Sequence, residues 1–284
     1  MRNNLPLPQL ARKLLFLIQV SRPIIWPVLP LVYALGLNAS HAPLSVVAII
    51  QIVLLTFPIN LVGCGLNDIY DYESDRRSSR RRAVWGAVVL NEDRPIVYRA
   101  ALAMMPLIVL GACLTRNWDN IVATISLLLV AWLYSVPPLR LKERPPLDSL
   151  ANGFGYFLLP FTMGYSLNAN PREMPLKYYL LALCVCGVHA LATAADYEAD
   201  RAAGHRTLAV KFGRRTAAAV AFAAFLIAWL FGDFNSVAVR AYIFCCTIAT
   251  LVATLIPSSI VIIAACVTIF AGFILAAICH VAGL

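Results

Sequence analysis

The chain has 284 residues, of which 61% are hydrophobic and only 13% charged, and its mean hydropathy is +0.78. Soluble domains are about 45–50% apolar and about 25% charged, so this composition excludes a water-soluble globule and a disordered chain. A membrane-spanning helix needs about 20 mostly apolar residues, so a chain of this length has room for roughly eight to ten of them. The sequence therefore predicts an all-α, polytopic membrane protein.

The net charge of +9 comes from basic residues concentrated in a few short loops. Such a distribution is typical of membrane-topology signals and does not favour a nucleic-acid partner. The eight cysteines all lie inside apolar runs without Cys-x-x-Cys spacing, so we expect neither a disulfide framework nor a zinc site. No small-residue cleavage site follows the first apolar stretch, which disfavours a cleaved signal peptide.

Long apolar runs bounded by charged residues, Pro or Gly predict nine spans within a single domain that covers residues 1–284. The approximate limits of the spans are 14–37, 45–66, 98–115, 120–136, 149–168, 176–195, 216–232, 240–256 and 258–282.

The basic residues also predict the orientation in the lipid bilayer. Of the 23 Lys and Arg residues, 19 lie on the side of the N-terminus and of the loops that follow the second, fourth and sixth spans. The positive-inside rule places that side in the cytoplasm, and the odd number of spans places the C-terminus on the other side. The bilayer itself is either a bacterial plasma membrane or a eukaryotic organelle membrane.

Two clusters of carboxylates lie at the cytoplasmic ends of the second and sixth spans. Asp68, Asp71 and Asp75 follow an i, i+3, i+7 spacing, so on a continuing helix they share one face. Asp196 and Asp200 are four residues apart and share a face in the same way. Like charges repel at these spacings, and a carboxylate at membrane depth costs about 2.5–3.5 kcal/mol, so a cation must offset the charge.

Oxygen ligands from one or two carboxylates, completed by water and substrate oxygens, are how proteins hold Mg²⁺. We therefore expect the two clusters, with Asn67 beside the first, to bind a pair of Mg²⁺ ions that bridge to one diphosphate. The alternative is an acidic cap that is solvated at the headgroup level and paired with the arginine-rich segment 76–82. The recurrence of the pattern at two span ends favours the metal sites.

Polar side chains near these clusters are candidates for binding substrate. Arginine suits bidentate phosphate contact and lysine acts as a point charge, although either can be a topology signal alone. The basic candidates in the same loops are Arg140, Lys142, Arg206 and Lys211. Asn60 lies two helical turns before Asn67. His189 lies two turns before Asp196, and it is either a base or a hydrogen-bonded residue of the bundle.

At this point the sequence resembles a known family. The segment 67–75 matches the NDxxDxxxD motif of the UbiA superfamily of intramembrane prenyltransferases, and the segment 196–210 resembles its second aspartate-rich motif with the loop that follows. The stretch 134–142 and the early Ser21-Arg22-Pro23 fit the same pattern. The segments 71–75 and 141–145 look most like the lycopene elongase branch, which makes C50 carotenoids.

The resemblance implies nine helices around a central cavity, in which an allylic prenyl diphosphate ionises and an apolar, carotenoid- or isoprenoid-like acceptor captures the carbocation. The residues that it implies for catalysis are Asp68, Asp71, Asp196 and Arg140. Those that it implies for metal binding are Asn67, Asp68, Asp71, Asp75, Asp196 and Asp200. Those expected to bind substrate are Asn67, Arg22, Tyr134, Arg140, Lys142, Arg206, Lys211, Asn60 and His189.

One position departs from the family pattern. Many members carry an acidic residue or Asn three residues before the middle Asp of the second motif, where this chain has Thr193. The substitution predicts a weaker or reshaped second metal site and argues against a quinone-type aromatic acceptor.

Two other functions stay open. A terpene cyclase on the same scaffold needs the same aspartates and a closed cavity, so the sequence barely separates it from a transferase. A cation transporter predicts acids near the membrane midplane and broken helices in two related halves. The acids here lie at span ends on one side, which disfavours transport.

Overall fold

The structure is a computed structural model that describes residues 8–71, 87 and 89–281. The regular elements within these residues are all helices, which confirms the predicted all-α fold class. The chain divides into a first unit, Met1–Leu139 with Pro160–Ala169, and a second unit, Arg140–Leu159 with Asn170–Leu284.

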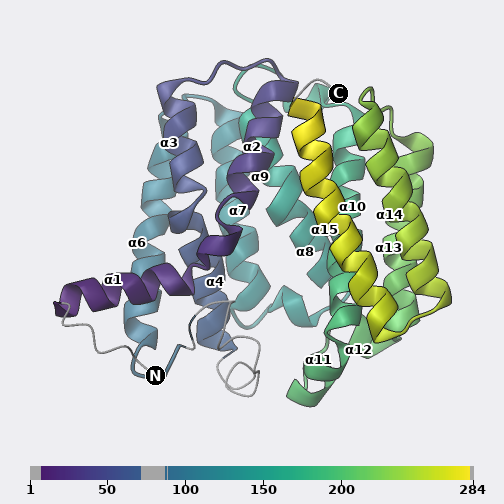
Figure 1. The fold of residues 1–284 in the computed structure, drawn as a ribbon. Helices are drawn as coiled ribbons and strands as arrows, with labels where there is room; N and C mark the ends of the chain where they lie inside the picture. The colour runs from purple at the N-terminus through teal and green to yellow at the C-terminus, as the bar shows by residue number, and fades with distance from the viewer. Residues whose placement is uncertain (1–7, 72–86, 88, 282–284) are drawn as a thin grey trace. The chain divides into compact units, whose positions relative to one another are not determined.

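The first unit is built around α4, which packs against α1, α3, α6 and α7 (Figure 1). Its elements are α1 (Gln9–Val20), η1 (Pro23–Ile25), α2 (Val28–Ala39), α3 (Val46–Leu54), α4 (Phe57–Tyr70), α6 (Arg94–Cys113), α7 (Trp118–Ser135) and nearly all of α9 (Leu159–Tyr165). A buried cluster that includes Val20, Leu61 and Val97 holds α1, α4 and α6 together.

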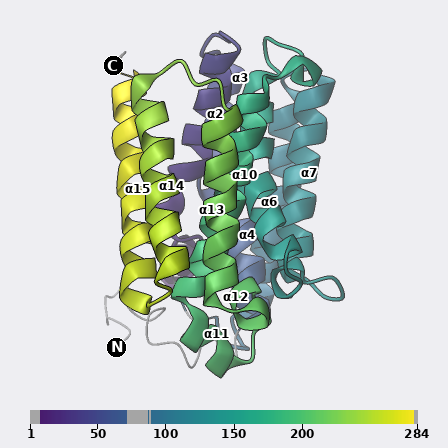
Figure 2. The same ribbon diagram turned by 90° about the vertical axis from the view of Figure 1, so that its right-hand side faces the viewer.

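The second unit is built around α10, which packs against α8, α12, α13 and α15. Its elements are η3 (Leu141–Glu143), α8 (Leu147–Gly153), the π-helical turn η4 (Phe154–Leu158), η5 (Pro171–Glu173), α10 (Leu176–Ala195), α11 (Tyr197–Ala203), α12 (Leu208–Phe212), α13 (Arg214–Phe231), α14 (Val237–Leu255) and α15 (Ser259–Val281). Figure 2 shows α13, α14 and α15 side by side.

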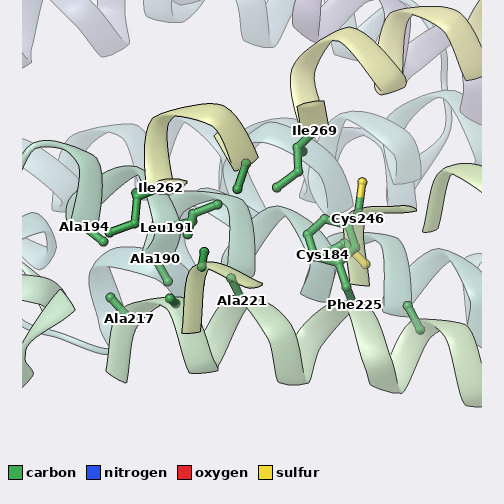
Figure 3. Close-up of a cluster of buried hydrophobic side chains, with 14 of the residues drawn as sticks. Cys184, Ala190, Leu191, Ala194, Ala217, Ala221, Phe225, Cys246, Ile262 and Ile269 are labelled. Atoms are coloured by element: carbon green, nitrogen blue, oxygen red, sulfur yellow. The ribbon is translucent and has the colours of Figure 1, made fainter. Parts of the chain in front are cut away.

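Small side chains let α10 and α13 approach closely. A Cβ atom added at Gly187 would lie 3.0 Å from the Cβ of Ala224 and 3.1 Å from the Cα of Ala221. Alanines from both helices fill the surrounding core, where Cys184 and Cys246 are also buried (Figure 3). Small residues are the usual means of close helix packing in membranes. All eight cysteines are free thiols in the structure.

Side-chain caps explain where several spans begin. The Oγ of Ser45 accepts a hydrogen bond from the backbone N–H of Ala48 at the start of α3, and the Oδ1 of Asn117 accepts one from Asn120 at the start of α7. Each of these oxygens satisfies a backbone donor that has no partner within its helix.

The predicted span over 14–37 is not one straight helix. The chain bends by 50° between α1 and the segment Pro23–Ala39. Arg22 adopts a left-handed conformation with φ of 53°, and Pro23 cannot continue the hydrogen bonding of α1. Figure 1 shows α1 turned away from the direction of α2. Leu10 and Leu14 of α1 are exposed.

The described residues contain seven helices that are long and apolar enough to cross a membrane, or eight when the bent pair at the N-terminus is one span. The remaining predicted span, 149–168, corresponds to α8, η4 and α9. A π-helical turn at Phe154–Leu158 interrupts this segment, so each piece is shorter than a span. The predicted total of nine and the central cavity therefore stay predictions.

A buried polar network connects four helices of the first unit. The Tyr33 hydroxyl donates to Oε1 of Gln51 at 2.7 Å, and Nε2 of Gln51 donates to Oδ1 of Asn120 at 2.7 Å. The amide of Asn120 in turn donates to the backbone oxygen of Met163 at 2.7 Å. Because every partner lies in a nearly dry interior, this network fixes the positions of α2, α3, α7 and α9 relative to one another.

Two glycines bring α2 and α9 into backbone contact. A Cβ atom added at Gly36 would lie 2.1 Å from the backbone oxygen of Phe161, and one added at Gly164 would lie 2.1 Å from the backbone oxygen of Tyr33. Backbone atoms cannot rotate away as a side chain can, so only glycine fits at either position.

Gly36→Ala is therefore expected to lower the free energy of unfolding by about 1–3 kcal/mol, the usual cost of overpacking a core. Thermal unfolding of the purified protein in detergent measures this effect. Gly63→Ala is the matched control, because a Cβ atom there meets nothing within 4 Å. Equal melting temperatures for the two variants would contradict the proposed close contact.

Candidate active site

The C-terminal end of α4 carries two buried carboxylates. Asp68 is only 1% exposed and Asp71, the residue that caps the helix, is 7% exposed. The N–H of Asp71 donates to the backbone oxygen of Asn67 at 3.0 Å, so the last turn is intact. Negative charge is unfavourable at the C-terminal end of a helix dipole and inside a low-dielectric interior. This end of α4 therefore requires a compensating cation.

Arg22 supplies one positive charge to this site. Its Nη2 lies 2.5 Å from Oδ1 of Asp68, and the ion pair is largely buried. The left-handed backbone of Arg22 costs about 1 kcal/mol or more for a residue with a side chain. Strain of this kind at an arginine that faces a buried acid is typical of functional sites, because the surrounding structure must hold it in place.

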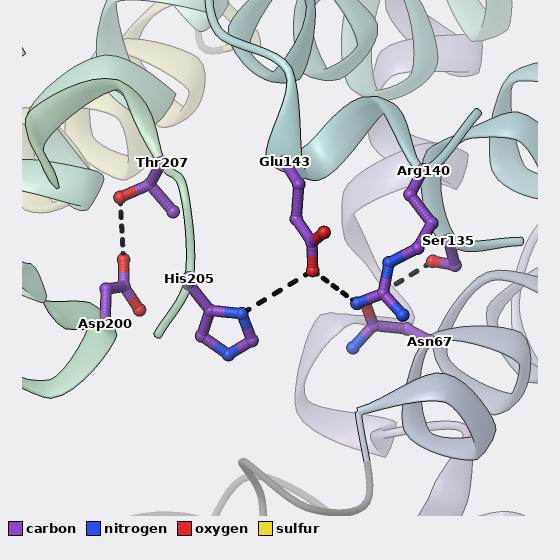
Figure 4. A network of polar contacts seen from close by, with 7 residues as sticks. All are labelled: Asn67, Ser135, Arg140, Glu143, Asp200, His205 and Thr207. Carbon is purple, nitrogen blue, oxygen red and sulfur yellow. Dashed lines mark hydrogen bonds and ion pairs between the residues drawn. The ribbon is translucent and has the colours of Figure 1, made fainter. Parts of the chain in front are cut away.

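Of the other predicted residues of the first unit, Asn67 and Tyr134 lie around the same end of α4, whereas Asn60 lies in the first turn of that helix. Ser135, the last residue of α7, donates its hydroxyl to Oδ1 of Asn67 at 3.4 Å (Figure 4), and Tyr134 lies next to it in α7. The amide of Asn60 donates to the backbone oxygen of Thr56 at 2.8 Å, within the first turn of its own helix. Asp75 lies outside the described residues.

In the second unit, α10 ends at Asp196, which also begins α11. The N–H of Asp200 still donates to the backbone oxygen of Asp196 at 2.9 Å, but the helix is broken at Asp196 with ψ of 7°. α10 therefore does not continue through the acidic motif, although the i, i+4 hydrogen bond between the two acids is kept. Asp200 instead accepts a hydrogen bond from the Thr207 hydroxyl at 3.1 Å (Figure 4).

Arg140 begins the short turn η3 with a left-handed φ of 39°. Its Nη2 lies 2.5 Å from Oε1 of Glu143, and Nδ1 of His205 lies 3.9 Å from the same oxygen (Figure 4). Lys142, in the same turn, is 9% exposed. Glu143 thus links the loop after α7 to the loop that precedes α12, and it is a residue that the sequence did not single out.

The side chains of the two remaining predicted basic residues are more exposed than those of Arg140 and Lys142. Arg206 is exposed, and so is Lys211, whose Nζ lies 5.0 Å from the centre of the Phe212 ring. Their place in a phosphate site stays a prediction.

Another carboxylate of the second unit, Asp148, was missed by the sequence analysis. Asp148 is fully buried, and its Oδ2 accepts a hydrogen bond from the N–H of Leu208 at 3.2 Å. Thr193 accepts one from the N–H of Ala209 at 3.2 Å. Together they satisfy backbone donors at the start of α12. The only signal for Asp148 in the sequence is a single acid at the edge of an apolar run.

The donors at the end of α4 fit Mg²⁺. Among the residues that the structure describes, no three His, Cys, Asp or Glu side chains are grouped closely enough to form a metal site by themselves. Mg²⁺ does not require such a group, because it is usually held by one or two carboxylates plus substrate phosphates and water. Two buried carboxylates, Asp68 and Asp71, beside the amide oxygen of Asn67 meet that requirement.

The chain matches the UbiA prenyltransferase family over residues 24–282. It is 28% identical to a lycopene elongase/hydratase of Corynebacterium glutamicum over 222 residues, 77% of each chain. It is 30% identical to a lycopene elongase/hydratase of Haloarcula japonica over 211 residues, 70% of this chain and 67% of that one. Its fold is similar to that of a UbiA homologue from Archaeoglobus fulgidus bound to DMAPP and Mg²⁺, with a TM-score of 0.69, 20% identity and coverage of 90% of this chain and 98% of that chain.

These similarities confirm the resemblance stated from the aspartate-rich motifs and its lycopene elongase branch. They confirm that the protein is a prenyltransferase and favour an enzyme over the cation-transporter alternative. They also agree with apolar helices that belong in a membrane. The family match covers well over half of the sequence, and the chain belongs to the UbiA prenyltransferase family.

Proposed function

We propose that the protein is a Mg²⁺-dependent prenyltransferase that moves the prenyl group of an allylic diphosphate to an apolar acceptor of the lycopene type. The observation that carries this proposal is the buried pair of Asp68 and Asp71 at the end of α4, with Arg22 on one of them. A site that keeps two carboxylates out of water is built for a cationic partner.

The residues proposed to hold the metal in the first unit are Asn67, Asp68 and Asp71, with Asp75 as a further ligand. In the second unit they are Asp196 and Asp200. Bound Mg²⁺ would neutralise the charge that develops on the leaving diphosphate.

Arg22 and Arg140 are proposed to bind and orient the diphosphate oxygens. A guanidinium offers a planar pair of donors that matches phosphate, and both arginines are already fixed by their backbones and by a carboxylate partner. Lys142, which is nearly buried, adds a point charge in the same turn as Arg140. Tyr134, Arg206 and Lys211 are placed in the substrate site on the strength of the sequence motifs alone.

The relatives support the choice of acceptor. The two curated relatives named above are lycopene elongase/hydratases, enzymes whose acceptor is a long apolar polyene. An apolar acceptor also suits the chemistry, because a carbocation survives only where water is excluded. We further propose that the acidic motifs and the N-terminus face the cytoplasm, as the positive charges of the flanking loops indicate.

The test is an assay of the purified protein with Mg²⁺, lycopene and the C5, C10, C15 or C20 allylic diphosphate. The expected result is a product whose mass equals lycopene plus prenyl units, together with released diphosphate. A cyclic hydrocarbon or alcohol from the diphosphate alone would instead identify a terpene cyclase. Diphosphate left intact with every donor would overturn the proposal.

A further inference from the structure

The start of α12 is fixed by two buried side chains of other helices. The N–H of Leu208 donates to Oδ2 of Asp148 in α8 at 3.2 Å, and the N–H of Ala209 donates to the Thr193 hydroxyl in α10, also at 3.2 Å. Asp148 is fully buried and Thr193 is 5% exposed. Several residues between positions 201 and 206, just before this point, are exposed. A surface segment is therefore tied to the interior of the second unit.

Asp148 is itself held in a fixed position. The N–H of Ser149 donates to its Oδ1 at 2.7 Å, so both carboxylate oxygens accept a backbone hydrogen bond. The Oγ of Ser149 lies 3.1 Å from Nδ1 of His189, which links α8 to α10 beside the carboxylate. Such a contact is what we expect of a hydrogen-bonded residue of the bundle, one of the two roles predicted for His189.

The residue that precedes the anchored N–H contacts the second acidic motif. The Thr207 hydroxyl donates to Oδ2 of Asp200 at 3.1 Å (Figure 4). Consecutive Cα atoms are about 3.8 Å apart, so fixing the N–H of Leu208 leaves Thr207 little freedom to move. The N–H of His205 adds a backbone contact between the same segments, with the oxygen of Asp200 at 2.9 Å. The hydrogen bonds therefore form one path from Asp148 through Thr207 to the carboxylate of Asp200.

A buried carboxylate is a costly way to hold a backbone N–H. A hydroxyl would satisfy the donor at lower desolvation cost, as that of Thr193 does for the next residue. A carboxylate holds an N–H about twice as strongly as a neutral acceptor does. The choice of an acid at position 148 is explained if the exact position of this segment matters to the site.

We propose that Asp148 is a positioning residue for the second acidic motif: by holding the N–H of Leu208, it places the Thr207 hydroxyl where it orients the carboxylate of Asp200 for Mg²⁺. This inference rests on the proposed function, in which Asp200 is a metal ligand. Partners that orient metal ligands in this way contribute about tenfold to a hundredfold to metal affinity or activity in other proteins.

Asp148→Asn tests the inference, because asparagine keeps the shape of the side chain but offers the two N–H groups one acceptor oxygen instead of two. The purified protein is titrated with Mg²⁺ at fixed concentrations of an allylic diphosphate and lycopene. We expect the Mg²⁺ concentration for half-maximal product formation to rise by about tenfold or more, while the rate at saturating Mg²⁺ falls by less than about threefold.

A second measurement needs no turnover. Mg²⁺ together with inorganic diphosphate should raise the melting temperature, because both bind only the folded protein. The Mg²⁺ concentration at the midpoint of this rise should be displaced in Asp148→Asn by a similar factor. A role confined to stability would instead lower the melting temperature and leave the midpoint where it is in the wild-type protein.

Thr207→Val removes the hydroxyl at the other end of the path. It should raise the Mg²⁺ requirement in the same way, and Thr207→Ser, which keeps the hydroxyl, should restore it. The double variant Asp148→Asn/Thr207→Val should need no more Mg²⁺ than Thr207→Val alone, because residues that act through one another are not additive. The Thr207 variants keep the inference open to refutation if Asp148→Asn does not fold.

Thr250→Val is the matched control. It removes a buried hydroxyl of the same unit, one that donates to the backbone oxygen of Cys246 in α14 at 2.7 Å. Its Mg²⁺ requirement should equal that of the wild-type protein. An unchanged requirement in Asp148→Asn or in Thr207→Val, or additive effects in the double variant, would overturn the positioning role.

Failure of the proposed function would look different. Wild-type protein that releases no diphosphate from any donor would overturn that function. The melting-temperature titration would still decide whether Asp148 positions the acidic motif, because it depends on binding alone.

Discussion

Asp71→Asn and Asp68→Asn are each expected to lower prenyl transfer by about a hundredfold to a thousandfold, or to abolish it, while the protein stays folded. The charge that holds the leaving group is lost, and preorganised charge at a developing anion is worth this much in other enzymes. Product formation from a prenyl diphosphate and lycopene measures the effect, and thermal unfolding in detergent reports the fold.

Asparagine is the substitution to use, because it keeps the shape of the side chain and an acceptor oxygen. Asp68→Ala would break the buried ion pair with Arg22, and breaking a buried ion pair costs about 3–5 kcal/mol. Loss of activity in that variant would therefore combine loss of the site with loss of the fold.

Asp119→Asn is the control, because Asp119 is an exposed acid in the first turn of α7. Full activity in both asparagine variants would remove the metal site from the mechanism.

Removing Mg²⁺ with excess EDTA is expected to stop product formation, and adding Mg²⁺ back is expected to restore it. A diphosphate cannot approach Asp68 and Asp71 without a cation between them, because the oxygens of both partners are negative. Activity that persists in excess EDTA would contradict the proposed mechanism.

A second readout separates metal binding from turnover. A ligand that binds only the folded protein raises its melting temperature, so Mg²⁺ together with inorganic diphosphate should stabilise the wild-type protein. The same additions should give a much smaller shift with Asp71→Asn. An identical shift in both proteins would place the binding of the metal elsewhere.

Most of the helices could be predicted from sequence because long apolar runs dominate this chain. The spans predicted at 176–195 and 120–136 agree with α10 and α7 to within about two residues. Where the prediction fails, the cause is local backbone geometry. The bend after α1 depends on a left-handed Arg22, and the break in the segment 147–165 depends on a π-helical turn, neither of which changes the hydrophobic pattern.

The residues of the site could be predicted from sequence only where they lie close together along the chain. Asp68 and Asp71 share the last turn of one helix, so their spacing was enough to place them together. Asp148 was missed because its partner is the backbone N–H of Leu208, sixty residues away, and a backbone donor leaves no mark in a sequence. Thr193 was noted only as a departure from the family motif, whereas its hydroxyl holds the start of α12.

Arg22 and Arg140, two of the three left-handed arginines among the described residues, differ in what a glycine would cost in their place. Glycine at position 140 would relax the backbone and leave Glu143, which is one-third exposed, in contact with water. Glycine at position 22 would relax the backbone equally, but it would remove the arginine that pairs with the buried carboxylate of Asp68. Selection for thermal stability alone would therefore allow arginine to be replaced at position 140 but not at position 22. Homologues that keep arginine at position 140 would then keep it because the reaction requires it.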